Sequence, residues 1–224
     1  VQYLMDKIVG SSRGDEDNND DLASDLVLAR CYRLVELIFG DDLASRELLL
    51  RVSADGEGLL SHILDVLSTA EGSLTVHEGA LRLLILWASN CSSVIQRVFR
   101  SPSHISAIML HLSPPAEQKS GERKLLRGLA AMFLAVSIST ISQSCAAGGN
   151  DKDMKTLMRV LKSVGVKAYA SACEMCEASV AVERHAKENT PFALSDRTAE
   201  RPVVVDPYLL SIVRPARECA DKVI

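Results

Sequence analysis

The sequence predicts an all-α protein with no significant sheet, and three observations favour this class. Aromatic side chains make up only 4% of the chain while hydrophobic residues reach 47%, a composition that suits Leu- and Ala-rich helices better than strands. Apolar residues recur three and four positions apart in one segment after another, which is the helical period. Clusters of Gly, Pro and polar residues separate these segments, and only Val203–Val205 is compatible with a short extended piece.

The chain begins with a short apolar segment followed by a run of acids. Val1–Met5 has the pattern of the middle of a helix, so we expect residues 1–21 to form the end of a preceding helix plus an acidic loop. Six acids and two bases lie in residues 1–21, which accounts for the whole formal net charge of -4. Residues 22–224 are predicted to be the C-terminal part of one larger helical domain, with neighbours missing at both ends.

The next predicted helix runs from about residue 22 to Phe39, capped by Asp21 or Ser24 and stopped by Gly40. Because its polar residues form only a narrow stripe, we expect the helix to be sandwiched between neighbours. The apolar residues with helical spacing are Leu22, Leu26, Ala29, Leu34 and Ile38, and the stripe consists of Arg30, Arg33 and Glu36.

The later apolar segments also have the helical period, and each is bounded by Gly, Pro or polar residues. They predict helices at 42–52, 58–69, 74–89, 92–100, 104–112, 122–143, 152–163, 166–177, 179–188 and 207–223. Pro207 fits the first turn of the last helix after Asp206 as a cap, and Pro215 is expected to kink it. The predicted core residues are Leu26, Leu34, Leu81, Leu84, Trp87, Leu129, Phe133 and Val136.

Two long apolar helices recur at a spacing typical of helical repeats. The segments beginning at Gly79 and Leu125 lie about 46 residues apart, inside the armadillo/HEAT range, and shorter helices separate them. Long buried helices alternating with shorter ones predict an armadillo/HEAT-like α-solenoid, a right-handed stack of helical repeats. A compact helical bundle is the competing geometry.

Composition also bears on compartment and partners. The six cysteines are spread through apolar helical patterns, as buried reduced thiols are, which favours a cytosolic protein. No Lys/Arg-rich tract is present, so neither nucleic-acid binding nor polybasic attraction to membranes is supported. The longest uncharged stretch, 128–150, contains a continuous apolar core too short to span a bilayer, so we interpret it as a helix buried inside the protein.

Patterns that would indicate a metal site are incomplete. Cys173 and Cys176 have zinc-type spacing, but His185 supplies at most a third ligand where a structural zinc site needs four. Residues 15–26 alternate acids as a calcium loop does, yet the glycine and the final glutamate of such a loop are absent. The histidines at 62, 77, 104 and 111 lack the spacing of a helical metal pair, and we interpret them as packing or surface residues.

The chain has no phosphate loop, nucleophile elbow, dinucleotide fingerprint or His-Glu-x-x-His motif. The sequence therefore predicts a protein that is not an enzyme, with no catalytic, cofactor-binding or metal-binding residues and no cofactor. No motif marks partner-binding residues. An enzyme is the least favoured alternative, and two or more convergent titratable groups in one deep pocket would revive it.

Five segments in a fixed order carry a resemblance to a known family. They are Glu47–Val52, Leu83–Cys91 with the short apolar helix that follows to Phe99, Gly128–Ile138, Val164–Tyr169 and Val205–Leu209. Together they resemble the head domain of the general vesicular transport factor family, golgin-like vesicle tethers with an armadillo head and a coiled-coil tail. The segments 10–21 and 145–150 depart from the family pattern, as does the lack of Leu after Trp87.

The resemblance implies a non-catalytic vesicle tethering head that docks transport vesicles in ER-to-Golgi and intra-Golgi traffic. Its implied partners are a Rab-type small GTPase and Golgi/SNARE-associated tethering machinery, and its implied location is cytoplasmic, peripheral on Golgi and vesicle membranes through those partners. The full-length protein would be a homodimer through its tail.

The alternative is an armadillo-type peptide-binding adaptor or scaffold, whose groove relies on repeated Trp and Asn. Because this chain has one Trp, we interpret Trp87 as core packing at a helix end and Asn90 as a helix-terminating residue.

Overall fold

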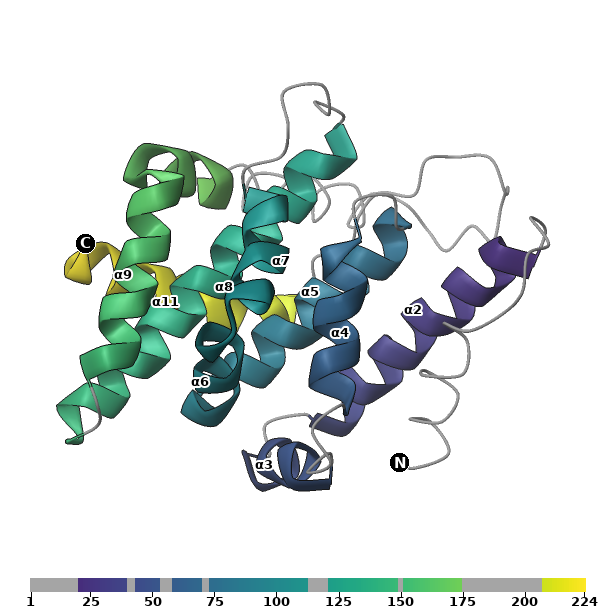
Figure 1. Cartoon of the computed structure of the whole chain (residues 1–224), viewed down its shortest axis with the longest axis horizontal. Coiled ribbons are helices and arrows are strands. Elements are labelled where there is room, and N and C mark those ends of the chain that lie inside the picture. Colours follow the sequence, from purple (N-terminus) through teal and green to yellow (C-terminus); the bar gives the residue numbers. More distant parts are fainter. Residues whose placement is uncertain are drawn as a thin grey trace.

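The computed structural model describes residues 20–39, 43–52, 58–69, 73–112, 121–148, 151–174 and 207–224. Every regular element in these ranges is a helix, so the all-α prediction is confirmed for the part of the chain that is described. The labelled helices in Figure 1 are α2 (Asp20–Phe39), α3 (Leu43–Val52), α4 (Leu59–Ser68), α5 (Leu74–Ala88), α6 (Ser92–Arg100), α7 (Pro102–Leu112), α8 (Gly121–Ala146), α9 (Asp151–Val164) and α11 (Pro207–Val223). Residues 166–174 are also helical.

Most helix boundaries lie within two residues of the predicted ones. Asp21 and Ser24 lie inside α2 and not before it, so neither is its N-terminal cap. α7 begins at Pro102, because proline fits the first helical turn. α11 continues through Pro215 to Val223. The predictions for residues 1–19, 179–188 and 189–206 lie outside the described residues.

The long helices pack in the order in which they occur along the chain. α2 packs against α5, α5 against α8, and α8 against α11. Shorter helices join this row: α4 packs against α5 and α7, while α6, α7 and α9 pack against α8. Figure 1 places α2 at one end of the molecule and α9 at the other.

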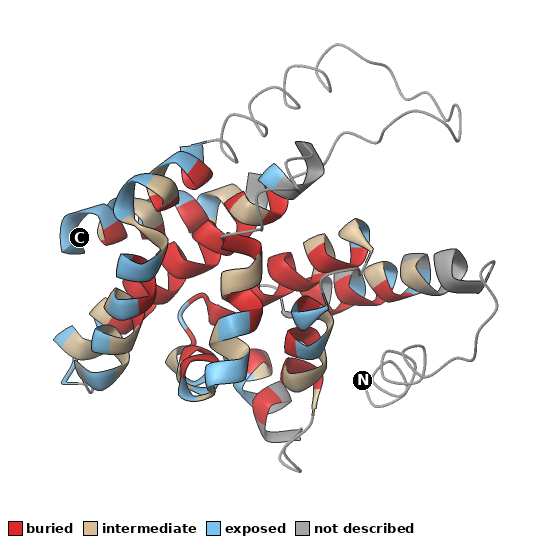
Figure 2. Cartoon of the chain, turned by 45° about the horizontal axis from the view of Figure 1, so that its top comes forward, coloured by how far each residue is buried: buried red, intermediate tan, exposed pale blue. Residues whose placement is uncertain are grey.

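The core follows α5 and the middle of α8, where most residues from Val76 to Ala88 and from Leu125 to Ile141 are buried, as the red segments in Figure 2 indicate. The stretch Lys124–Ala146 is long and apolar enough to cross a membrane by length and composition, but 83% of its most apolar window is buried inside the protein. The core helix of a folded protein passes the same test. This burial fits the interpretation of the uncharged stretch as an internal helix.

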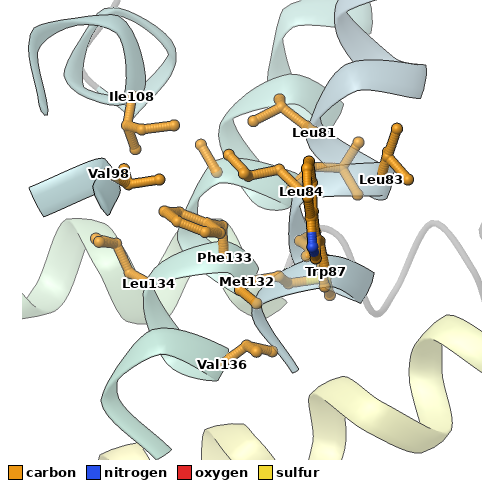
Figure 3. Close-up of a cluster of buried hydrophobic side chains, with 14 of the residues drawn as sticks. Leu81, Leu83, Leu84, Trp87, Val98, Ile108, Met132, Phe133, Leu134 and Val136 are labelled. Carbon is orange, nitrogen blue, oxygen red and sulfur yellow. The ribbon is translucent and has the colours of Figure 1, made fainter. Parts of the chain in front are cut away.

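The predicted core residues on α5 and α8 are confirmed, and the prediction for α2 is wrong in one position. Figure 3 shows Leu84 and Trp87 of α5 beside Phe133 of α8. The buried set is Leu81, Leu84, Trp87, Leu129, Phe133 and Val136. Leu34 is instead 48% exposed. Within the described residues α2 packs against α3 and α5, and these two helices leave the side with Leu34 uncovered. The Leu26 side chain lies outside the described part of the chain.

α2 also differs from its predicted polar stripe. Glu36 is buried and lies 3.5 Å, Oε1 to Nε, from Arg82 of α5, which itself is 3.7 Å from Glu78. A carboxylate can be buried in this way because a guanidinium compensates its charge. Nearby, Gly79 brings the helices close, since a Cβ there would lie 3.2 Å from Cδ2 of Tyr32.

Candidate functional site

The C-terminal end of α5 is tied to α3 by two buried hydrogen bonds. The Trp87 indole Nε1 donates to the carbonyl oxygen of Arg46 at 2.9 Å, and Nη1 of Arg46 donates to the carbonyl oxygen of Ser89 at 2.7 Å. The guanidinium thereby satisfies a carbonyl that the end of the helix leaves without an intrahelical partner. Trp87 is buried core at a helix end, as interpreted from the sequence.

The turn after Trp87 is tied to α8. Asn90 has φ 59°, a left-handed conformation that asparagine tolerates better than most residues. The backbone N–H of Asn90 donates to Oγ1 of Thr140 at 3.2 Å, and that hydroxyl donates to the carbonyl oxygen of Ala88 at 3.3 Å. The interpretation of Asn90 as a helix-terminating residue is therefore confirmed.

Two buried histidines from different helices meet at the end of α4. Nε2 of His77 lies 3.0 Å from the carbonyl oxygen of Val66, and Nε2 of His111 lies 2.9 Å from that of Leu67. The rings are 5.0 Å apart in an edge-on arrangement. Because a carbonyl oxygen only accepts, each Nε2 carries a hydrogen and donates it. The pair therefore caps α4 and joins it to α5 and α7.

The other titratable groups in the described ranges form no metal-binding cluster with this pair. Among the described residues no three His, Cys, Asp or Glu are grouped so that they could hold a metal ion. His104 stands apart, with Nδ1 3.4 Å from the carbonyl oxygen of Arg97. Cys173 is buried, whereas Cys176, His185 and the predicted calcium-like acids before residue 20 lie outside the described residues.

Burial also limits the reactivity of two thiols. It raises the pKa of the Cys31 and Cys91 thiols above the ordinary value, and a raised pKa leaves little of the nucleophilic thiolate. Both side chains lie in the apolar core. Their surroundings are those of packing residues.

An ordered group of charges lies on the exposed face of α9. Lys152, Lys155, Arg159 and Lys162 are all exposed and follow one another at spacings of three and four residues. This spacing places them on one face of the helix. We call these four residues the α9 basic stripe.

Sequence reasoning missed both the histidine pair and the α9 basic stripe. The histidines are far apart in the sequence and meet only because α5 and α7 converge on α4. The stripe forms no basic tract, because two or three non-basic residues separate each member from the next. A helical projection of 152–163 could have found it, since the periodicity that predicts the helix also predicts its charged face.

In its described ranges the protein belongs to the all-α class. Its buried polar groups tie helix ends together, and α9 exposes a basic face. Comparison of the chain with protein-family models, with curated proteins and with solved structures finds no match. The proposals below therefore rest on the residues and their packing.

Proposed function

We propose that this chain is part of a non-catalytic vesicle tethering head, built as an armadillo/HEAT-like α-solenoid. The head docks transport vesicles in ER-to-Golgi and intra-Golgi traffic by binding to partner proteins. It works in the cytoplasm, peripheral on Golgi and vesicle membranes, and a coiled-coil tail in the full-length protein makes the molecule a dimer.

The observation that carries the proposal is the packing order of the long helices. α2, α5, α8 and α11 pack successively, each against the next, with shorter helices beside them. A stack of helical repeats needs this order, because each unit covers the core of its neighbour. On α2, Leu34 is 48% exposed and Val27 is 46% exposed. Exposed apolar side chains of this kind are expected on the end unit of a stack, where a further repeat would cover them.

The five segments that resemble the tether family support the same proposal. One of them, Leu83–Cys91, forms the end of α5 and its turn, where Trp87 and Asn90 have structural partners in α3 and α8. This residue pattern ends a helix and joins it to two neighbouring helices. A family with the same helical packing would need the same residues at that position.

The peptide-binding adaptor is less well supported. Its groove needs exposed Trp and Asn side chains on successive helices, whereas Trp87 is buried and donates to Arg46. Micromolar binding of a basic peptide would favour the adaptor over the tether.

A Rab-type GTPase is the proposed partner because the resemblance to the tether family implies one. The switch loops of such a GTPase are ordered only with GTP. A head that contacts those loops binds the two nucleotide states differently. The test is capture of Golgi Rab proteins, locked with GTP or with GDP, on the immobilised chain. We expect at least one Rab to be retained in its GTP form alone, and retention of none would contradict the proposal.

A further inference from the structure

We propose that the α9 basic stripe is a direct docking surface for a membrane that carries anionic lipids. This inference goes beyond the proposed tethering, in which partner proteins alone hold the head at the membrane. It assigns the membrane contact to α9, at the end of the molecule away from α2 (Figure 1).

The packing of α9 fixes which way its charges face. Leu157, Val160 and Leu161 lie on the opposite side of the helix and are buried in the core. Through this side α9 packs against α8, α6 and α7. The stripe is therefore held outward by the core and spans about 15 Å from its first to its last residue.

Within the described part of the chain, the charges in the middle and at the end of the stripe are not neutralised by acids. Buried Arg82 is paired with Glu36 and Glu78, and Arg217 is paired with Glu174 and Asp221. No ion pair joins Lys155, Arg159 or Lys162 to an acid whose side chain the structure describes. The two acids of α9, Asp151 and Asp153, both lie in its first turn, so the rest of the face is purely basic.

An exposed apolar side chain follows the stripe and favours a membrane over other anionic partners. After the turn at Gly165, where φ is 86°, Val166 is 46% exposed and the next residue, Lys167, is exposed as well. An aliphatic side chain beside lysines suits the boundary between lipid headgroups and acyl chains. The stripe holds no aromatic side chain on which a nucleic-acid base could stack.

The expected binding is electrostatic, and the contribution of each basic residue to the affinity can be stated. Each Lys or Arg at an anionic membrane surface strengthens adsorption about fivefold. Such binding weakens with salt, because the screening length falls from about 10 Å at 0.1 M to about 3 Å at 1 M.

The test is flotation of the chain with vesicles of phosphatidylcholine alone or mixed with phosphatidylserine. We expect binding to the mixed vesicles only, and its loss at high salt. Lys155→Gln with Arg159→Gln should weaken it about 25-fold. The matched control is Arg30→Gln with Lys124→Gln, two exposed bases on α2 and α8, which should leave binding within about twofold.

Circular dichroism checks that both double variants keep their helices. The inference is overturned if phosphatidylserine does not increase binding, or if the two double variants weaken it equally. Binding of an acidic protein to the stripe without binding of vesicles also overturns it. Since the assay contains no GTPase, its failure leaves Rab capture unaffected, and failed Rab capture leaves the vesicle result standing.

Discussion

Trp87 and Arg46 are joined across the boundary between α5 and α3, the indole of Trp87 donating to the Arg46 carbonyl while the Arg46 guanidinium reaches the carbonyl of Ser89. Each residue therefore contributes to satisfying the backbone near the other. The chain segment from 88 to 90 is in turn held on α8 through Thr140. Three helices depend on the one turn at the end of α5.

Replacing Trp87 by Phe should separate the hydrogen bond from the packing of the ring. Trp87→Phe leaves the Arg46 carbonyl without its buried donor and should lower the free energy of unfolding by about 1–3 kcal/mol. Trp87→Ala adds a cavity and should cost about 3–5 kcal/mol. Urea unfolding followed by circular dichroism measures both, and an unchanged midpoint for Trp87→Phe would show that the bond contributes nothing.

Leu84 and Leu34 are a matched pair, because the sequence pattern predicts both as core residues of apolar helices. Leu84 is fully buried, so Leu84→Ala should destabilise by about 2–5 kcal/mol. Leu34 is 48% exposed, so Leu34→Ala should change stability by no more than about 0.5 kcal/mol. Thermal unfolding of the two variants tests this, and equal losses would contradict the exposed position of Leu34.

The buried pair of Glu36 and Arg82 should be costly to break on one side only. Glu36→Leu leaves the Arg82 charge near α2 poorly compensated and should destabilise by about 3 kcal/mol. The double variant Glu36→Leu with Arg82→Met removes both charges and should recover most of that loss. Chemical unfolding of the single and double variants gives the coupling, and simple additivity of the two effects would argue against the pair.

His62 should make the protein less stable in mild acid. Burial lowers its pKa below the ordinary 6.5, an effect that Asp65 partly opposes. In the unfolded chain His62 takes up a proton near pH 6.5, while in the folded state it stays neutral to lower pH. Its contribution is therefore intact above pH 6.5 and is lost as the pH falls below that value.

The variant His62→Gln removes this titration from the folding equilibrium. The difference in unfolding free energy between pH 7 and pH 5 should become smaller in the variant than in the original chain. Urea titrations at the two pH values measure it. An identical or larger difference in His62→Gln would show that His62 does not titrate as its burial requires.

Sequence patterns predicted the helices well, because apolar spacing and Gly or Pro boundaries are local properties. They also predicted the roles of Trp87 and Asn90, where a helix visibly ends. They were wrong about Leu34 because periodicity tells which residues share a face and not whether a neighbour covers that face. Glu36 illustrates the converse, since its burial depends on Arg82 from a helix more than forty residues away.

The sites were harder to predict than the helices for the same reason. His77 and His111 meet through the packing of three helices, and no local spacing indicates their contact. The α9 basic stripe was within reach of sequence reasoning, but a search for continuous basic tracts overlooks charges spaced by the helical period.

The central claim, a tethering head that reads the nucleotide state of a GTPase, is tested most directly by affinity. Titration calorimetry should compare the chain with one Golgi Rab protein locked with GTP and the same protein locked with GDP. We expect binding to the GTP form at least tenfold tighter, a difference of about 1.4 kcal/mol in binding free energy. Equal affinity for the two forms, across the Golgi Rab proteins, would contradict the claim.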